Sequence, residues 1–296
     1  MRWWPDVTKV LVTGALGLLG STLVPFLRTR GHSVLRQGRK GDADICVDLA
    51  KTSQVCSVLD DVNPDVIVNL AALTNVDECE RNPQHAYLSN VHIVENLVKW
   101  IQDRANICHL VQISTDQVYE GAGPHRESDI NLTNYYGFSK YAAELAAFGV
   151  SSTVLRTNFF GKSQCPNKNS LSDWLVQSLS MGKQLTVFDD VRFSPLSLHR
   201  LSEFLELVIE KRHTGVYNLG SKDGMSKADF AFALAEALNL PTQNMARGTS
   251  ATANLKAYRP KDMCMDSSHF ENDFGVELPT LKDEIQSMRA IYGHNA

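Results

Sequence analysis

Short apolar runs alternate with longer amphipathic segments through the first half of this 296-residue chain. The short runs are rich in valine, isoleucine and leucine, which favours buried strands, and the longer ones repeat apolar residues at helical spacing. Such alternation is typical of right-handed βαβ units that build a parallel sheet covered by helices on both faces. We therefore predict an α/β fold with a doubly wound parallel sheet. The predicted strands are 9–14, 32–38, 65–72, 107–115 and 151–160, and the predicted helices are 21–31, 52–63, 85–105 and 136–148.

The pattern loosens after residue 160. We predict that residues 1–160 form the main domain and that residues 161–296 mainly form a smaller lobe, with a stretch at about 196–220 returning to the main sheet. In doubly wound sheets, ligands bind beyond the carboxyl ends of the strands, so the residues that follow each strand are candidates for a site. In the second half, helical spacing recurs within 170–182, 193–211, 226–240 and 278–293, and strand-like runs lie at 185–190 and 215–221.

The composition is that of an ordinary globular protein. Hydrophobic residues make up 43% and charged residues 21%, the net charge is −4, and no apolar run approaches the roughly 20 residues that span a bilayer. The first residues lack the apolar core of a signal peptide, so we expect a cytoplasmic protein. Without a basic tract, neither nucleic acid nor a membrane is an expected partner. The six cysteines show no CxxC pair and no nearby histidine cluster, so we expect neither disulfides nor a metal site.

Three glycines follow the first predicted strand in the segment VTGALGLLGSTL, residues 12–23. Gly14, Gly17 and Gly20 occupy the turn between this strand and the next helix. Glycine lets a backbone approach a ligand or a neighbouring helix closely, and the free amides of a helix start attract phosphate. The turn is therefore a candidate phosphate site, although turn geometry alone explains the glycines in many such turns.

A tyrosine and a lysine four residues apart are the most informative pair, in the segment NYYGFSKYAAE. Tyr136 and Lys140 share one face of the predicted helix, and a neighbouring ammonium would lower the pKa of a phenol from about 10 towards neutral pH. Such a tyrosine can exchange a proton with a carbonyl or a hydroxyl. Tyr135 has Ser139 at the matching offset, so Tyr136 is the better candidate. The alternative is that both residues lie on the solvent face of an amphipathic helix.

Hydroxyl and carboxyl side chains follow the strand at 107–115, in ISTDQVYEG. Ser114 and Thr115 can donate hydrogen bonds to a substrate oxygen where negative charge develops. Ordinary turn chemistry is the alternative, because Ser, Thr and Asp often bond the local backbone.

Together these segments resemble the extended short-chain dehydrogenase/reductase superfamily. The marks are TGALGLLG after the first strand, NLAALTNVD and STDQVY after two later strands, and YGFSK on the next helix. Within that superfamily the chain looks most like the dTDP-4-dehydrorhamnose reductase group, on TNVDECE, STDQVYEG, NYYGFSKYAAE, VLRTNFFG, FSPLSLHRL and YRPKDMCMDSSHF. The resemblance implies that residues 1–160 are a Rossmann-type NAD(P)-binding domain and that the C-terminal lobe binds substrate.

The resemblance also implies an enzyme of deoxysugar or polysaccharide biosynthesis, in which NAD(P)H reduces the C4 ketone of a nucleotide-linked 4-keto-6-deoxy sugar. Tyr136 would donate the proton, Lys140 would lower the tyrosine pKa and hold the nicotinamide ribose, and Thr115 would bind the reacting oxygen. The cofactor-binding residues would be Gly14, Gly17, Leu18, Leu19 and Gly20 at the pyrophosphate, Asp48 and Leu49 at the adenine, Ala71, Ala72 and Thr74 at the middle, and Asn90, Ser114, Tyr136 and Lys140 nearby. The substrate-binding residues would be Thr74, Asp77, Phe159 and Arg259.

The second predicted strand bears on the choice of cofactor. NAD enzymes usually carry a carboxylate there for the ribose 2′-hydroxyl, whereas VLRQGRKG offers Arg36, Arg39 and Lys40, with no acid before Asp42. We therefore expect NADPH, with NADH as the alternative. The competing explanation is that these cations form a solvated loop face.

Two departures from the family pattern constrain the reaction. Related 4,6-dehydratases carry an Asp-Glu pair after the catalytic threonine, but here Asp116 is followed by Gln117, which does not exchange protons at neutral pH, so dehydration is disfavoured. Rhamnose-forming reductases usually have a tryptophan where this chain has Asn158, Phe159 and Phe160, so the sugar and the configuration at C4 stay open.

Two other functions fit the same fold. A regulatory subunit would bind NADP without turnover, and the β subunit of methionine adenosyltransferase resembles this same reductase group. An epimerase would act on a nucleotide sugar and retain its cofactor through the full cycle. Family members usually pair through a helix bundle, which implies a homodimer. Arg259 suits a diphosphate, but a surface salt bridge explains it as well.

Overall fold

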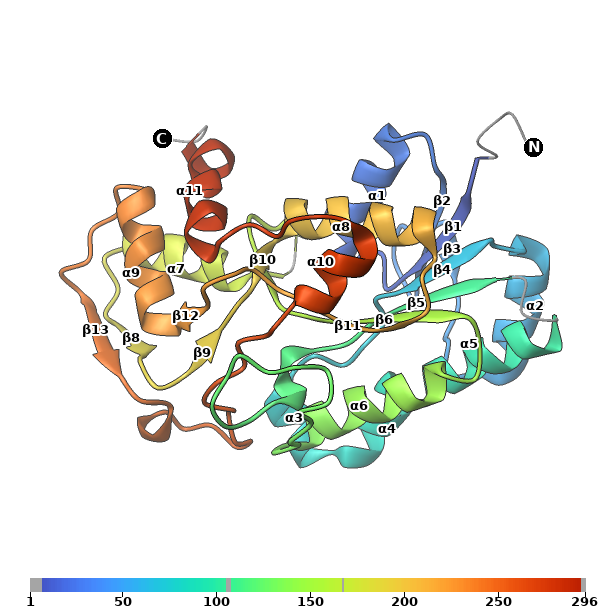
Figure 1. Cartoon of the computed structure of the whole chain (residues 1–296), viewed down its shortest axis with the longest axis horizontal. Helices are drawn as coiled ribbons and strands as arrows, with labels where there is room; N and C mark the ends of the chain where they lie inside the picture. The colour runs from blue at the N-terminus through green and yellow to red at the C-terminus, as the bar shows by residue number, and fades with distance from the viewer. Residues whose placement is uncertain (1–6, 105–107, 167, 294–296) are drawn as a thin grey trace.

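A seven-stranded parallel sheet forms the centre of the molecule (Figure 1). The structure, a computed structural model, describes residues 7–104, 108–166 and 168–293. The strand order β11-β6-β5-β4-β1-β2-β3 starts in the middle and builds outward in both directions. This order confirms the predicted doubly wound α/β fold. The strands are β1 (Lys9–Thr13), β2 (Ser33–Gly38), β3 (Ile45–Cys46), β4 (Val66–Asn69), β5 (His109–Ile113), β6 (Ser152–Thr157) and β11 (Gly215–Leu219).

Helices cover both faces of this sheet, because β4 and β5 are buried over their whole length and need apolar cover on either side. One hydrophobic core lies between the sheet and the helices α1, α8 and α10, and a second lies between the opposite face and α2, α5 and α6. The bounds are α1 (Gly20–Thr29), α2 (Thr52–Val62), α5 (His92–Asp103), α6 (Tyr135–Ala147), α8 (Leu198–Lys211) and α10 (Ser268–Phe274).

The segment predicted as one helix over 85–105 contains two helices. They are α4 (Pro83–Asn90) and α5, with Val91 between them; residue 105 lies outside the described residues, as does residue 107 at the start of the next predicted strand. A further helix, α3 (Val76–Arg81), was not predicted. Asparagine side chains start both short helices, because Asn75 accepts the Glu78 amide at 2.9 Å and Asn82 accepts the His85 amide at 3.0 Å.

The segment predicted as one strand over 151–160 is also divided. β6 ends at Thr157, and β7 (Phe159–Phe160) pairs instead with β10 (Leu196–Ser197) in a separate two-stranded sheet. Asn158 lies between the two strands, and its side-chain amide donates to Asp116 Oδ2 at 2.7 Å. β6 therefore ends just before Asn158, whose side chain bonds to a residue that follows β5.

The lobe has a hydrophobic core of its own, in which Phe160 and Phe193 meet the Phe230 ring edge-on with centroids 4.8 and 5.3 Å away. Two further two-stranded sheets frame this core, β8 with β13 in parallel and β9 with β12 in antiparallel pairing. The elements are α7 (Leu171–Ser180), α9 (Lys227–Ala237), α11 (Leu281–Tyr292), β8 (Leu185–Phe188), β9 (Arg192–Phe193), β12 (Met225–Ser226), β13 (Met245–Gly248) and the 3₁₀ turn η2 (Ser250–Thr252).

The chain returns from the lobe to the main sheet twice. β11 pairs with β6 along its full length, and α8 packs beside α1. Later, α10 packs against β11, where Phe270 and Phe274 stack at 4.3 Å and both meet the Tyr217 ring edge-on. The second return is not visible in the sequence pattern. No helix among the described residues is long and apolar enough to cross a membrane.

Candidate active site

The turn between β1 and α1 has a shape that requires glycine at two of its positions. Gly14 has a φ of +60°, and a Cβ there would lie 2.9 Å from the Ala71 backbone. A Cβ on Gly20 would lie 2.5 Å from the carbonyl oxygen of Ala15. A side chain at either position would collide with backbone, so both glycines keep the turn packed, whatever it binds.

The start of α1 is suited to an anion. This helix has no side-chain N-cap, and within the described part of the chain the amides of Leu18 and Leu19 donate to no protein acceptor. The helix dipole adds positive potential at the same place. Gln37 holds the turn from β2, because it accepts the Gly14 amide at 3.1 Å and donates to the Val47 carbonyl at 2.8 Å. The residues present therefore fit the pyrophosphate of a dinucleotide.

Arg36 has an acidic partner that the sequence analysis did not assign. Its Nη2 lies 2.9 Å from Asp44 Oδ1, and its Nη1 lies 3.6 Å from Asp42. The hydrogen bond from Arg36 lowers the pKa of Asp44 to about 2, so this carboxylate is charged at neutral pH and offsets the arginine. Arg39 and Lys40 are exposed and take part in none of the ion pairs found among the described residues. These two are the cations available to a 2′-phosphate.

The two residues assigned to the adenine lie in the turn that leads into α2. Asp48 accepts the Ala50 amide at 3.1 Å through Oδ1, which shapes the turn. Leu49 is buried, and its carbonyl accepts from the Asn96 side chain at 2.9 Å. Both residues come directly after the short strand β3, which pairs with the carboxyl end of β2.

Asn90 holds the loop that follows β4. Its Oδ1 accepts the Leu73 amide at 2.7 Å, while its Nδ2 donates to the Leu73 carbonyl at 3.1 Å and to Ser139 Oγ at 2.8 Å. Both donor hydrogens are committed to protein acceptors, so Asn90 holds this loop in place, and its expected proximity to the cofactor stays a prediction. The loop at 71–74, with Thr74 exposed on it, is thereby fixed against α6.

Thr115 and Tyr136 come together at the carboxyl end of β5. Thr115 caps the 3₁₀ turn η1 (Asp116–Val118) and donates from its hydroxyl to Asp116 Oδ1 at 3.2 Å, and its side chain is near enough to Tyr136 to lower the pKa of that phenol. Asn134 starts α6 by accepting the Gly137 amide at 2.8 Å, which places Tyr136 in the first helical turn. Thr115 is 4% and Tyr136 8% exposed, so a substrate oxygen bound here would be largely shielded from water.

The pKa of Tyr136 lies above its ordinary value. Burial raises it, the hydrogen bond with Thr115 lowers it, and the charge of Asp116 raises it again. The expected lowering by Lys140 is not found, because the Lys140 ammonium donates to the Ile113 carbonyl at 2.6 Å and the loss of hydration outweighs the other effects.

The hydroxyl of Ser114 faces α6. It donates to the buried carboxylate of Glu144, so its hydrogen is committed within the protein, and its expected contact with cofactor or substrate stays a prediction. Glu144 lies one helical turn beyond Lys140. Burial lowers the pKa of Lys140 to about 8, and the negative charge of Glu144 raises it.

Asp77 and Arg259 are both occupied by contacts between α3 and the lobe. Arg259 Nη2 lies 2.9 Å from Asp77 Oδ1, which also accepts the amides of Lys256 and Ala257 at 3.2 and 3.0 Å. The structure thus contains the salt bridge that was the alternative explanation for Arg259. Phe159 is half-buried and packs against the core between the sheet and α1.

Asp116 and Lys227 add charges that the sequence analysis did not assign to the site. Burial raises the pKa of Asp116 to about 6, and the hydrogen bond from Asn158 lowers it. Lys227 is the first residue of α9, where burial lowers its pKa and Asp116 raises it. Its ammonium lies 5.7 Å from the centre of the Phe193 ring and lines a slot of about 120 Å³ between α7, β8 and α9. No spacing in the sequence relates Lys227 to Asp116, so only the fold identifies this pair.

Residues 8–293 match the family described as RmlD substrate binding domain. The chain belongs to the RmlD family.

Relatives of this RmlD chain include a reductase and a subunit of another enzyme. It is 28% identical, over 95% of its length and 97% of the relative, to the probable low-salt glycan biosynthesis reductase Agl14 of Haloferax volcanii. It is 29% identical, over 89% of its length and 81% of the relative, to methionine adenosyltransferase 2 subunit beta of Bos taurus. Among solved structures, dTDP-4-dehydrorhamnose reductase of Bacillus anthracis in complex with NADP has the same fold, with a TM-score of 0.87, 24% identity and coverage of 96% and 99%.

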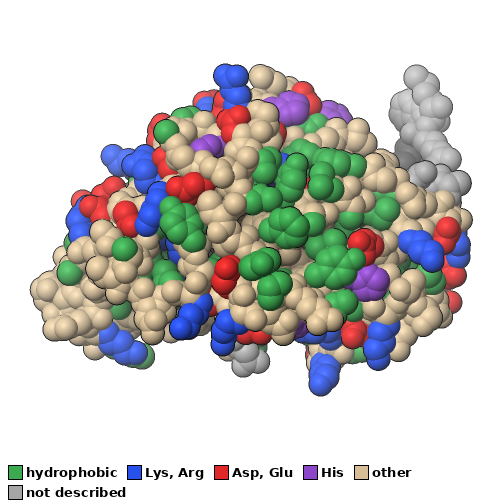
Figure 2. All heavy atoms as spheres, turned by 90° about the horizontal axis from the view of Figure 1, so that it is seen from below, with side chains coloured by type: hydrophobic (Ala, Val, Ile, Leu, Met, Phe, Trp, Pro, Cys, Tyr) green, Lys and Arg blue, Asp and Glu red, His purple; other side chains and the backbone are tan. Residues whose placement is uncertain are grey.

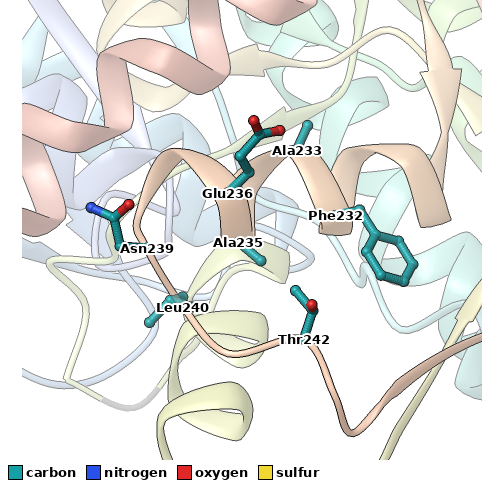
Figure 3. Close-up of a pocket in the computed structure, with 7 residues that line it drawn as sticks. All are labelled: Phe232, Ala233, Ala235, Glu236, Asn239, Leu240 and Thr242. Carbon is teal, nitrogen blue, oxygen red and sulfur yellow. The ribbon is translucent and has the colours of Figure 1, made fainter.

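A groove of about 480 Å³ lies beside α9 in this RmlD chain, away from the residues described above (Figure 3). None of the predicted site residues lines it, so it is not part of the candidate active site. Its lining residues are Phe232, Ala233, Ala235, Glu236, Asn239, Leu240 and Thr242.

One group of side chains, also outside the site, has donor atoms at metal-ligand spacing. The donor atoms of His32, Glu206 and Glu210 lie within 4.8 Å of one another, between the end of α1 and α8. Arg30 Nε lies 3.3 Å from Glu206, so this carboxylate already has a cationic partner. We assign no metal to this group.

Proposed function

We propose that this RmlD-family protein reduces the C4 ketone of a nucleotide-linked 4-keto-6-deoxy sugar with NADPH. The observation that carries the proposal is that Thr115 and Tyr136 are both buried next to the carboxyl end of β5, with Lys140 one helical turn from Tyr136. A carbonyl oxygen that takes up negative charge needs hydrogen-bond donors and a proton source, and these side chains offer both. The anion site at the start of α1, at the same edge of the sheet, supports a dinucleotide as the partner.

Tyr136 is the proton donor in this proposal. Its raised pKa keeps the phenol protonated at neutral pH, so it has a proton to give as the carbonyl becomes an alcohol. Thr115 binds the same oxygen, and Lys140 holds the nicotinamide ribose. NADPH, when bound, supplies the hydride.

The loop after β2 supports NADPH over NADH. Arg36 is offset by Asp44, but Arg39 and Lys40 are exposed cations in the place where a ribose 2′-phosphate would lie in this fold. The Bacillus anthracis reductase, which was solved in complex with NADP, agrees with this choice.

The test is oxidation of NADPH, followed by absorbance, with a panel of dTDP-, GDP- and CDP-linked 4-keto-6-deoxy hexoses. We expect turnover with one nucleotide, and a loss of about 10²-fold to 10⁴-fold in kcat for Tyr136→Phe. Tyr135→Phe is the matched control, because this neighbouring tyrosine is 47% exposed and has no part in the pair with Thr115. Absence of turnover across the whole panel would contradict the proposal.

A regulatory role is the second candidate, supported by the likeness to methionine adenosyltransferase 2 subunit beta. In that case the protein would bind NADPH tightly, but none of the sugar nucleotides in the panel would cause NADPH to be oxidised. The affinity for NADPH would be unchanged in Tyr136→Phe. An epimerase, the third candidate, would retain its cofactor through repeated turnovers without net oxidation. Calorimetric cofactor binding, measured beside the absorbance assay, separates these outcomes.

We also propose that the protein is a homodimer, paired through an apolar patch on α4 and α6. Exposed hydrophobic side chains gather on this face of the molecule (Figure 2). The same stripe on a second copy would be self-complementary about a two-fold axis. Phe138→Glu is expected to give a monomer in light scattering, and an unchanged mass would refute this pairing. The patch consists of Tyr87, Leu88, Phe138, Leu145 and Phe148, which are between 40% and 57% exposed.

A further inference from the structure

A fully buried ion pair lies behind the candidate active site. Glu144 on α6 is 0% exposed and Arg156 on β6 is 3% exposed. Arg156 Nε lies 3.1 Å from both carboxylate oxygens, and its Nη2 lies 2.6 Å from Oε2. The remaining guanidinium nitrogen donates to Tyr119 Oη at 2.8 Å and to the Glu127 carbonyl at 2.6 Å. Both charges are therefore fixed in position by protein partners.

Such a pair is a poor way to join a helix to a sheet. Burying two charges costs much of what their attraction returns, and apolar side chains of similar size often stabilise a fold as well or better. The neighbours of Glu144 on the same helix face, Ala143 and Ala147, already pack apolar surface against the sheet. The charge of Glu144 therefore calls for an explanation other than attachment of α6.

Glu144 lies one helical turn beyond Lys140 on α6, and its negative charge raises the pKa of the Lys140 ammonium. Lys140 is 4% exposed and loses its hydration, while the Ile113 carbonyl from β5 gives its ammonium one acceptor. Cys79 from α3 also faces it, but burial raises the pKa of that thiol to about 11, so the thiol is neutral at neutral pH. Tyr136, one turn earlier on α6, is protonated for the same reason.

In the described part of the chain, no carboxylate other than Glu144 shifts the pKa of Lys140. Asn90 on α4 and Ser139 on α6 are uncharged and bonded to each other. Asp116 in η1 acts on Tyr136 and Lys227, and burial raises its own pKa to about 6. Arg156 forms an ion pair with the Glu144 carboxylate, with Nη2 2.6 Å from Oε2.

We propose that Glu144 is a positioning residue for the site, which keeps Lys140 as an ammonium and, through the hydroxyl of Ser114, holds the segment after β5 against α6. This inference rests on the proposed role of Lys140 at the nicotinamide ribose. Without Glu144, an amine buried in this place would lose its proton near neutral pH, and it would no longer attract the bound dinucleotide through its charge.

The size of the effect follows from the helix geometry. Side chains four residues apart lie about 6 Å from each other, and one charge at that distance shifts a pKa by about two units at an effective dielectric constant of about 20. The pKa of Lys140 is about 8 with Glu144 present. Removal of the carboxylate charge would therefore move the deprotonation of Lys140 to about pH 6, an order-of-magnitude value from the same relation.

The experiment measures the dissociation constant of NADP⁺ by calorimetry between pH 5 and 10. We expect wild-type binding to weaken through a transition near pH 8 that is absent in Lys140→Met. Glu144→Gln keeps the shape and should move this transition down by one to two pH units. Arg156→Lys is the matched control, because it keeps a cation beside Glu144, and should leave the midpoint in place.

A second variant protects the test against misfolding. Glu144→Gln leaves the Arg156 charge buried and unpaired, so the double variant Glu144→Gln/Arg156→Gln removes both charges and should still shift the transition by at least about one unit. A midpoint that stays at the wild-type pH in a folded variant, or a transition that persists in Lys140→Met, overturns the proposal. The readout here is the binding of NADP⁺, so it can be interpreted even if the protein turns over no sugar nucleotide in the reductase assay.

Discussion

His109 should make the stability of this protein depend on pH below neutrality. The residue lies at the start of β5, is 3% exposed, and has ring nitrogens 2.9 and 2.8 Å from the hydroxyls of Ser151 and Thr153. Burial lowers its pKa from 6.5 to about 4, with a further contribution from Arg212. Between pH 6.5 and 4, the unfolded chain therefore binds a proton that the folded chain does not, and acidification favours unfolding.

The magnitude is about 3 kcal/mol, since each unit of pKa difference is worth about 1.4 kcal/mol. The loss begins as the pH falls through 6.5 and is complete near pH 4, where the folded protein also takes up the proton. Asp116 acts in the opposite direction, because its pKa is raised to about 6 and the folded state gains its proton first. The prediction therefore concerns the difference between wild type and His109→Gln, in which the contribution of Asp116 cancels.

The assay is urea unfolding followed by circular dichroism at several pH values between 7 and 4. His109→Gln should lose a fixed amount of stability at pH 7, and the gap to the wild type should shrink or reverse by about 3 kcal/mol on reaching pH 4. A gap that is independent of pH would refute the reasoning, because it would mean that His109 titrates alike in the folded and unfolded chains.

Three further predictions concern the candidate site. Gly20→Ala should lower the free energy of unfolding by about 1 to 3 kcal/mol, because its Cβ would lie 2.5 Å from a backbone oxygen; unchanged urea unfolding would contradict this packing. Arg39→Ala should raise the Kd for NADPH about tenfold and leave that for NADH unchanged, since only the former has a 2′-phosphate; equal effects would mean that Arg39 does not discriminate. Arg259→Ala should raise the KM for the nucleotide sugar if Arg259 binds the diphosphate. If Arg259 only forms the salt bridge with Asp77, the KM should equal that of the wild type, and the free energy of unfolding should change by less than about 1 kcal/mol.

The alternation of strands and helices along the first half of the chain, and the doubly wound parallel sheet that it builds, could be predicted because they depend on local patterns. Each buried strand and each amphipathic helix carries its own periodicity, and βαβ handedness then leaves few topologies. The boundaries failed where a single side chain intervenes. The strand expected over 151–160 is divided at Asn158, which bonds Asp116, and the helix expected over 85–105 is divided next to Asn90, which bonds the loop after β4.

The candidate site could be predicted in its types of residue but not in their partners. Thr115 and Tyr136 stand in segments with recognisable order, and the fold brings their side chains into contact. Ser114 was assigned to a ligand because nothing in the sequence relates it to Glu144 on another element. Which distant residues contact each other depends on how the folded chain packs, so the spacing of residues in the sequence does not predict these contacts.

The two returns of the chain to the main sheet have a consequence for protein engineering and for evolution. β11 and α8 lie beyond residue 195 and α10 lies beyond residue 267, yet all three complete the core that contains Leu205, Tyr217 and Phe270. A fragment ending at residue 160 would leave that face of the sheet bare, so it would not serve as a stand-alone domain in the way a contiguous cassette would. Exchange of the lobe between relatives would need several junctions at once, so a chimaera would have to carry all three returning elements from the same parent to keep this core intact.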